Sequence, residues 1–121
     1  MKKILVVDDS DSIREIVSMT LEKEGYEIIL GVDGVDALSK IENQDELSLI
    51  ITDLHMPNMD GIGLIKKVRS SDKYSRIPIL FLTTETQIGK KMEAKQAGAT
   101  GWIIKPFIPT KLLLAVKKVI K

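Results

Sequence analysis

Residues 4–9 read ILVVDD, an apolar run of the kind that forms a buried strand, followed by the two carboxylates Asp8 and Asp9. A second run, LIITD at residues 49–53, has the same pattern and ends in Asp53. If the two runs are neighbouring strands of one parallel sheet, three carboxylates meet at one edge of that sheet. Carboxylates this close raise one another's pKa, so the cluster requires a metal ion or a lysine to compensate its charge. The pattern therefore predicts a binding site at this edge.

Short apolar runs alternate with segments of helical periodicity five times along the chain. The predicted strands are residues 4–7, 26–32, 49–53, 79–82 and 101–104. A helix is predicted after each of them. Alternation of this kind favours a doubly wound α/β fold, in which helices cover both faces of a five-stranded parallel sheet. The pattern leaves no segment for a second domain, and we expect residues 1–121 to form one domain.

Capping signals mark the ends of several predicted helices. Ser12 and Glu15 have the spacing of a capping box at the start of the first helix, and Asp60 is the predicted N-cap of the third. The fourth helix, residues 87–97, is mostly polar, stops at Gly98 and is expected to pack shallowly. The last helix is predicted to reach the end of the chain. In the first two helices, the apolar positions expected to be buried are Ile13, Ile16, Val17, Leu21, Val35, Leu38 and Ile41.

The 121-residue chain contains no cysteine and a single histidine, His55. Disulfides, thiolate nucleophiles and zinc sites built from cysteine or clustered histidines are therefore excluded. No apolar run approaches the roughly 20 residues that span a bilayer, and the first residues lead straight into a strand rather than a signal peptide. We expect a cytoplasmic protein without membrane insertion. Because the chain starts at Met1 and stops after one terminal helix, we also expect a free-standing module.

The formal net charge of +1 conceals a strong asymmetry. Residues 87–121 contain eight lysines and one acidic residue, a charge of +7, so residues 1–86 carry −6. The lysine-rich third is either an ordinary solvated surface or a surface for an acidic partner. Nucleic acid is a poorer fit, because aromatic side chains do not alternate with these lysines.

Ligands of doubly wound sheets bind outside the carboxyl ends of the strands. The side chains within a residue or two of those ends are Asp8, Asp9, Asp53, Thr83 and Lys105. Carboxylate oxygens favour magnesium, with manganese as the alternative, and we expect Asp9 and Asp53 to be direct ligands. An aspartate left partly uncoordinated can attack a phosphoryl group, which Lys105 and Thr83 would then contact. This set of residues predicts a site for a divalent cation and a phosphoryl group.

Four short motifs carry a resemblance to a known family. They are VVDDS at residues 6–10, DLHMPNMDG at 53–61, TTE at 83–85 and KPF at 105–107. Together and in this order they resemble the response-regulator receiver domains of two-component signal transduction, most closely the single-domain chemotaxis regulators. The resemblance implies a (βα)5 fold with the flavodoxin-like strand order 2-1-3-4-5.

The resemblance also implies a role for each residue of the site. Asp53 would accept a phosphoryl group from a histidine kinase. Mg²⁺ would be held by Asp8, Asp9 and Asp53 and by the backbone carbonyl of His55, while Lys105 would contact the phosphoryl group. Such a protein catalyses only its own phosphorylation and autodephosphorylation, and is otherwise not an enzyme.

Further roles follow from the same resemblance. Thr83 would be a hydroxyl switch coupled to an aromatic residue in the fifth strand, here Trp102, where tyrosine or phenylalanine is more common in the family. The side chains of His55 and Glu85 would tune the access of water to the acyl phosphate, and so the rate of dephosphorylation. A cis peptide bond is implied between Lys105 and Pro106.

The output surface implied by the resemblance consists of the fourth helix, the fifth strand and the fifth helix. It coincides with the lysine-rich third of the chain. Phosphorylation would switch this face to bind a protein partner, which in a chemotaxis regulator is the flagellar motor switch. A phosphatase would be a further partner, and we expect the protein to be a monomer.

Alternatives of several classes stay open at this point. A phosphorelay intermediate and a receiver cut from a larger regulator belong to the same family. A magnesium-dependent phosphatase with an aspartyl nucleophile usually has a second acidic residue two positions later, where this chain has His55. A flavodoxin-like binder of nucleotides or flavins would need a phosphate-binding loop after the first strand, and no glycine-rich segment follows residues 4–7.

Overall fold

A computed structural model describes residues 1–120 and contains one sheet of five parallel strands. The strand order is β2-β1-β3-β4-β5, as predicted. The strands are β1 (Lys3–Val7), β2 (Glu27–Gly31), β3 (Leu47–Thr52), β4 (Ile79–Thr83) and β5 (Gly101–Ile104). Strand β2 lies on one side of β1, and β3, β4 and β5 follow on its other side, so the strand order reverses between β1 and β3. Ligands of such sheets bind near this switch point.

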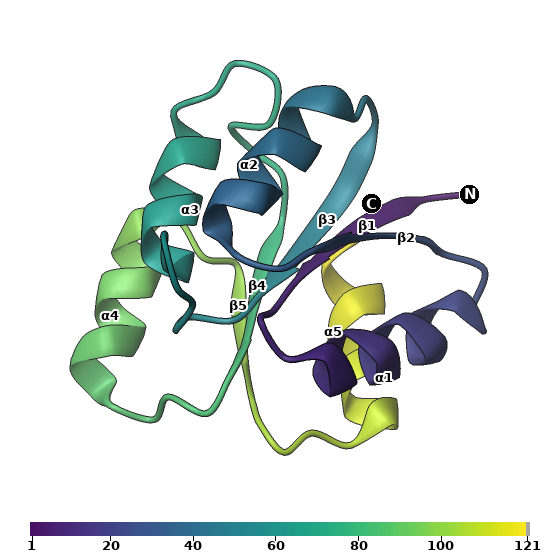
Figure 1. Cartoon of the computed structure of the whole chain (residues 1–121). Helices are drawn as coiled ribbons and strands as arrows, with labels where there is room; N and C mark the ends of the chain where they lie inside the picture. The colour runs from purple at the N-terminus through teal and green to yellow at the C-terminus, as the bar shows by residue number, and fades with distance from the viewer. Residues whose placement is uncertain (121) are drawn as a thin grey trace.

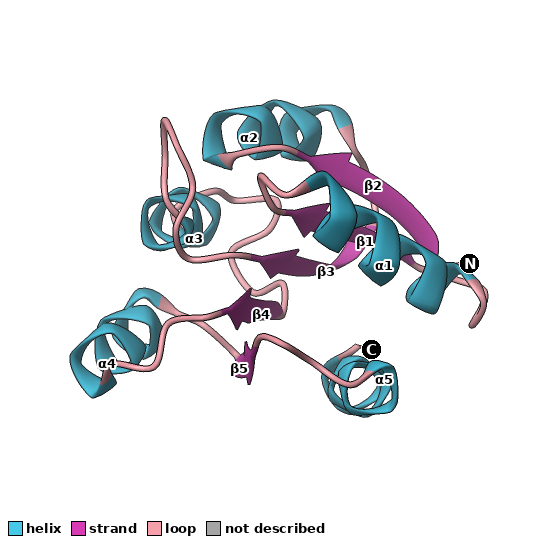
Figure 2. Ribbon diagram, turned by 60° about the horizontal axis from the view of Figure 1, so that its bottom comes forward, coloured by secondary structure: helices cyan, strands magenta, loops and turns pink. Residues whose placement is uncertain are grey.

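Helices cover both faces of the sheet, as Figures 1 and 2 show. They are α1 (Asp11–Glu22), α2 (Gly34–Asn43), α3 (Gly61–Arg69), α4 (Ile88–Ala97) and α5 (Pro109–Val119). Helices α1 and α5 lie on one face, and α2, α3 and α4 lie on the other. The alternating strands and helices of the sequence therefore form the predicted doubly wound fold.

The sheet separates two apolar cores, and neighbouring residues of one strand contribute to different cores. In β3, Ile50 faces the core beneath α2, α3 and α4, whereas Leu49 and Ile51 face the core beneath α1 and α5. All three side chains are almost inaccessible to solvent. This explains why the central strands are continuous apolar runs rather than alternating ones: side chains are buried on both faces of a parallel sheet.

The predicted start of α1 is wrong, and two other predicted helix ends are confirmed. The N-cap of α1 is Ser10, not Ser12: the Oγ of Ser10 accepts a hydrogen bond from Ile13 N, and the helix already includes Ser12. Asp60 caps α3 through a hydrogen bond from Gly63 N at 2.8 Å. Gly98 ends α4 in the left-handed conformation, with a φ of 116° that favours glycine.

Two apolar residues predicted to be buried are exposed. Ile16 in α1 and Val35 in α2 lie at the solvent edge of their helices. In α4 only Ala94 is buried, and Ile88 and Met92 keep 75% and 57% of their surfaces accessible. The prediction of shallow packing for α4 is confirmed, and the helix presents apolar side chains that its own fold does not cover.

Other boundaries differ from the predictions by one or two residues. Strand β2 is shorter than the predicted 26–32, and β3 begins two residues earlier than predicted and ends at Thr52. Helix α5 ends at Val119 and the backbone of Ile120 is extended, so the prediction that this helix reaches the end of the chain is wrong at Ile120, while Lys121 lies outside the described residues. No helix within residues 1–120 is both long enough and apolar enough to cross a membrane.

Candidate functional site

The backbone holds the residues that follow three strands at one edge of the sheet. The N–H of Asp8 donates to the carbonyl of Gly31 at 3.1 Å, and the N–H of Asp53 donates to the carbonyl of Val7 at 3.0 Å. Lys105 N donates to the carbonyl of Thr83 at 2.8 Å. The parallel hydrogen-bond ladder thus continues one residue beyond β1, β3 and β5, and it places these polar side chains on the same edge.

Three carboxylates meet at this edge. Asp8, Asp9 and Asp53 each offer an oxygen atom, and these oxygens all lie within 4.8 Å of one another. Asp8 is buried, with 2% of its surface accessible, Asp53 is half-buried and Asp9 is exposed. The convergence expected from the two apolar runs is therefore present, and its open side lies at Asp9.

Lys105 is the cation inside the cluster. Its Nζ lies 2.6 Å from Asp8 Oδ2 and 3.1 Å from Asp53 Oδ2, and only 11% of its side chain is accessible. Burial alone lowers the pKa of Lys105, but hydrogen bonds and attraction from the two carboxylates outweigh it and raise that pKa above its ordinary value. Lys105 is therefore a fixed ammonium at neutral pH.

Burial acts in the opposite direction on Asp8. Desolvation raises the pKa of Asp8 above its usual range, and the negative charge of Asp53 adds to this. The hydrogen bonds from Lys105 and from Ser10 N only partly offset the increase. With three carboxylates and one ammonium, the ionised cluster carries two uncompensated negative charges, so a divalent cation would relieve its repulsion.

The donor set fits a magnesium ion. Mg²⁺ binds oxygen at about 2.1 Å in octahedral geometry, so two directly bound oxygens are at most about 4.2 Å apart. The carboxylate oxygens, which lie within 4.8 Å of one another, meet this limit after small shifts or through a bridging water. Oxygen donors without sulfur or imidazole favour magnesium or manganese over zinc or copper.

Two loops meet at the mouth of the site. Thr83, the last residue of β4, is fully buried, and its Oγ1 accepts a hydrogen bond from Glu85 N at 3.2 Å. The side chain of Glu85 reaches across to His55, with 2.7 Å between Glu85 Oε1 and His55 Nε2. Its second oxygen accepts a hydrogen bond from Gln87 N, the N-cap residue of α4. The loop after β4 is thereby joined both to the loop after β3 and to the start of α4.

The first residue of α3, Gly61, lies close to the backbone of Asp53. Gly61 N donates to the carbonyl of Leu54 at 2.8 Å. A Cβ atom at position 61 would stand 2.4 Å from the carbonyl oxygen of Asp53 and 2.5 Å from the Phe81 ring. The peptide bond between Lys105 and Pro106, on the other side of the site, is cis, as the family resemblance implied.

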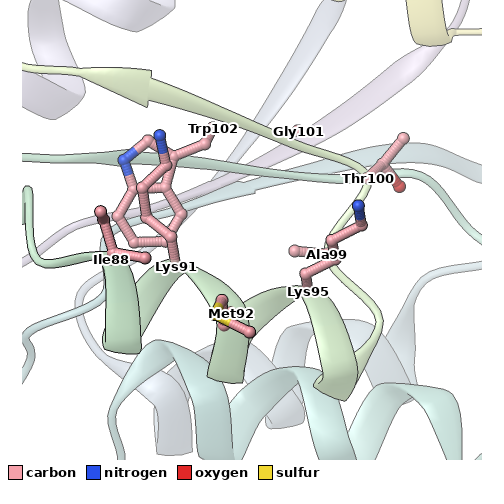
Figure 3. Close-up of a pocket in the computed structure, with 8 residues that line it drawn as sticks. All are labelled: Ile88, Lys91, Met92, Lys95, Ala99, Thr100, Gly101 and Trp102. Carbon is pink, nitrogen blue, oxygen red and sulfur yellow. The ribbon is translucent and has the colours of Figure 1, made fainter.

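Trp102 lies away from the carboxylates, in a pocket between α4 and β5. The pocket has a volume of about 300 Å³ and is lined by Ile88, Lys91, Met92, Lys95, Ala99, Thr100, Gly101 and Trp102. Figure 3 shows the ammonium-bearing chain of Lys91 crossing the indole, and Lys91 Nζ is 5.7 Å from the ring centroid. The indole also contacts the ring of Phe81 in the core, at a centroid distance of 5.3 Å. None of the three carboxylates lines this pocket, and neither Lys105 nor Thr83 does.

Sequence reasoning overlooked one residue beside the carboxylates. Arg14, in the first turn of α1, donates a hydrogen bond from Nη1 to the backbone carbonyl of Asp8 at 2.5 Å. Its position one helical turn beyond the VVDDS motif was the only available signal, and that position alone does not show where a side chain points.

Comparisons of the sequence and of the structure with known proteins agree that the chain is similar to receiver domains. The model of the response regulator receiver domain matches residues 4–117. The chemotaxis protein CheY1 of Helicobacter pylori is 43% identical over 108 residues, which cover 88% of this chain and 87% of that protein. The structure of the chemotaxis response regulator CheY4 of Vibrio cholerae superposes with a TM-score of 0.93 and 48% identity, covering 99% of both chains.

A solved structure with lower sequence identity to this chain contains a bound metal ion. The receiver domain of the sensor histidine kinase PA1611 of Pseudomonas aeruginosa is 27% identical, with a TM-score of 0.89 over 98% of this chain and 96% of that one. That structure has a magnesium ion coordinated in its active-site cleft. Because the family model spans nearly the whole chain and the strand order agrees, the chain belongs to the response regulator receiver domain family, as a CheY-type protein of two-component signalling.

Proposed function

We propose that this chain is a phosphorylation-activated chemotaxis regulator. Asp53 accepts a phosphoryl group from the phosphohistidine of a histidine kinase, and the acyl phosphate switches the surface formed by α4, β5 and α5. The observation that carries the proposal is the convergence of Asp8, Asp9, Asp53 and Lys105 at one sheet edge in a chain of the receiver family. Residues 1–121 act as a single receiver domain, cytoplasmic and monomeric.

Asp53 supplies the nucleophile. One of its carboxylate oxygens forms a bond to phosphorus while the phosphorus–nitrogen bond of the donor breaks, and the departing imidazole keeps the electron pair. The Oδ1 of Asp53 already accepts a hydrogen bond from Leu54 N at 2.7 Å, which holds the carboxylate plane. Lys105 Nζ, which lies 3.1 Å from Oδ2, would share its charge with the phosphoryl oxygens, and the Thr83 hydroxyl would donate a hydrogen bond to another of them.

Asp8, Asp9 and Asp53 would hold Mg²⁺, or Mn²⁺ in its place, with the backbone carbonyl of His55 as a further ligand. The metal would supply charge neutralisation for the incoming phosphoryl group. Hydrolysis of the acyl phosphate resets the protein. The side chains of His55 and Glu85, whose 2.7 Å contact closes part of the mouth, would limit the water that reaches the phosphoryl group and so tune the lifetime of the signal.

Magnesium is expected to raise the thermal stability of the protein through this cluster. At a free concentration 100 times the Kd, the stabilisation is about 2.7 kcal/mol, which corresponds to an increase in Tm of roughly 10 °C for a domain of this size. In Asp9→Asn, the increase is expected to shrink to less than about half, because one ligand charge is lost. The Tm of this variant without metal is expected to rise slightly, since like-charge repulsion is relieved.

Differential scanning calorimetry with MgCl₂ and with EDTA measures both effects. Asp60→Asn is the matched control, because Asp60 caps α3 outside the cluster and asparagine is an equally good N-cap. If Mg²⁺ raised the Tm of wild type and of Asp9→Asn equally, Asp9 would not be a ligand of the metal.

The surface around the Trp102 pocket is suited to an acidic partner. Exposed Ile88 and Met92 supply apolar contacts, while Lys91 and Lys95 add positive charge at the same pocket. Glu85 connects the start of this helix to the mouth of the phosphorylation site, so a shift at Thr83 can reach the surface through α4. Since CheY1 of Helicobacter pylori and CheY4 of Vibrio cholerae, to which this chain is similar over most of its length, are chemotaxis proteins, the proposed partner is a flagellar motor switch protein.

Binding to a purified flagellar motor switch protein tests this function. With Mg²⁺ and a small phosphodonor, the affinity is expected to rise by roughly 10-fold or more over the unphosphorylated protein. Lys91→Glu is expected to weaken the phosphorylated complex, whereas Lys67→Glu, on the exposed side of α3, is not. Affinity that is independent of the phosphodonor would contradict the proposal. Transfer of the phosphoryl group to a histidine phosphotransfer protein would instead identify a phosphorelay intermediate.

A further inference from the structure

We propose that Arg14 is a positioning residue for the metal site: its guanidinium fixes the peptide that joins Asp8 to Asp9, and so the angle between their carboxylates. This inference rests on the proposed function, because it concerns the affinity of the same site for Mg²⁺. Arg14 touches neither the carboxylate of Asp8 nor that of Asp9 in any contact found within residues 1–120. It acts on them through the backbone.

The contact is close, and the Arg14 side chain is largely shielded from water. The side chain of Arg14 is only 13% accessible, and its Nη1 donates to the carbonyl oxygen of Asp8 at 2.5 Å. Its Nη2 donates to the carboxylate of Asp11 on the same helix. Two nitrogens of one planar group are thus occupied at once, which fixes the orientation of the guanidinium.

The carbonyl of Asp8 and the amide of Asp9 belong to the same rigid peptide plane. Holding the carbonyl oxygen therefore restricts the rotation of the whole plane, which fixes the N and Cα of Asp9 and so limits the positions that its carboxylate can reach. The Asp8 carboxylate is held separately by Lys105 Nζ at 2.6 Å and by Ser10 N at 2.9 Å. Asp9, the exposed member, has no comparable side-chain hydrogen bond within the described residues, so the peptide plane is its main constraint.

The remaining hydrogen bonds of the turn close a ring around this peptide. Arg14 N donates to the carbonyl of Ser10 at 3.1 Å, and Ser10 N donates to the carboxylate of Asp8. The side chain of Arg14 then returns to the carbonyl of Asp8. These hydrogen bonds connect the turn between β1 and α1 to the first turn of α1. Replacing Arg14 removes the hydrogen bond to the carbonyl of Asp8, and with it a restraint on the Asp8–Asp9 peptide.

Charge and positioning have opposite effects on metal affinity at Arg14, which makes the proposal testable. The positive charge of Arg14 repels a cation, so charge alone predicts tighter Mg²⁺ binding when the residue is neutralised. Loss of positioning predicts weaker binding, because ligands that are free to move must be ordered when the metal binds. Arg14→Lys keeps the positive charge but loses the planar guanidinium with its two hydrogen bonds, and Arg14→Met loses both the charge and these hydrogen bonds. If positioning is dominant, both variants bind Mg²⁺ more weakly than wild type.

Isothermal titration calorimetry with MgCl₂ on the whole chain measures this directly. We expect the Kd for Mg²⁺ to increase by about 10-fold in both Arg14→Lys and Arg14→Met. Arg76→Met is the matched control, since Arg76 is exposed and precedes β4 at the opposite edge of the sheet, and its Kd is expected to equal that of wild type. A Kd within about twofold of wild type in both Arg14 variants, or tighter binding by Arg14→Met, would overturn the proposal.

A second measurement separates positioning from damage to the fold. The rate of phosphorylation by a small phosphodonor is expected to fall at low Mg²⁺ in both Arg14 variants and to return close to the wild-type rate once Mg²⁺ saturates them. A rate that stays low at saturating Mg²⁺ would show that Arg14 acts otherwise than through the metal. If wild type itself binds no Mg²⁺, it is the proposed function that fails, and the two failures are therefore distinguishable.

Discussion

Asp53→Asn is expected to incorporate no phosphoryl group when it is incubated with Mg²⁺ and acetyl phosphate, under conditions in which the wild-type protein becomes phosphorylated. Asparagine has nearly the same shape, and its side-chain oxygen can still accept the hydrogen bond that Leu54 N donates at 2.7 Å. It lacks the anionic oxygen that attacks phosphorus, so the rate is expected to fall by roughly 10³-fold or more. Intact-protein mass spectrometry measures the mass of the added phosphoryl group.

The matched control for this loss is Asp60→Asn. Asp60 lies seven residues later in the same loop-and-helix segment, but its carboxylate accepts a hydrogen bond from Gly63 N and caps α3. Its replacement is expected to leave phosphorylation at the wild-type level. Phosphoryl incorporation by Asp53→Asn at a rate comparable to that of wild type would contradict the assignment of Asp53 as the acceptor.

Gly61→Ala, at the first residue of α3, is expected to be strongly destabilising. The new Cβ would lie 2.4 Å from the carbonyl oxygen of Asp53 and 2.5 Å from the Phe81 ring. Neither neighbour can yield easily, since one is backbone and the other is a fully buried aromatic side chain. We expect a loss of about 3 kcal/mol in the free energy of unfolding, a large part of the roughly 5–15 kcal/mol typical of a domain.

Urea titration followed by circular dichroism measures this loss. Gly89→Ala in α4 is the matched control, because no atom other than those of its chain neighbours and its own helix backbone lies within 4 Å of the added Cβ. Alanine has the higher helix propensity, so this variant is expected to be unchanged or more stable by up to about 1 kcal/mol. A Gly61→Ala protein within about 0.5 kcal/mol of wild type would show that the segment from Asp53 to Gly61 relaxes more freely than its contacts indicate.

The main features of the fold could be predicted from the sequence because they are properties of runs of residues. Continuous apolar runs such as residues 49–52 have side chains buried on both faces, which requires a parallel sheet between helical layers. Local signals were less reliable where two candidates compete. Ser10 and Ser12 can both cap α1, and the choice of Ser10 depends on the turn that the Asp8 carboxylate makes with Ser10 N.

Exposure was harder to predict than secondary structure. Ile16 and Val35 have the spacing of buried helix positions, but their side chains are exposed. How many helical positions become buried depends on how much of each helix the assembled sheet covers, and the helix sequence alone does not determine that. Ile88 and Met92 are exposed for a related reason, since α4 covers the edge of the sheet beside β5. The same placement creates the pocket at Trp102.

The amino-acid sequence by itself determined the order of strands and helices, the clustering of Asp8, Asp9 and Asp53, and the placement of Lys105 beside them. These follow from the alternation of apolar strands and helices along the chain, because polar residues at the carboxyl ends of parallel strands share one edge of the sheet. The tertiary structure alone decided the Arg14 contact with the Asp8 carbonyl, the close approach at Gly61 and the bridge from His55 to Glu85. Each depends on the direction of a side chain or the distance between separate backbone segments, and packing rather than local sequence sets those quantities.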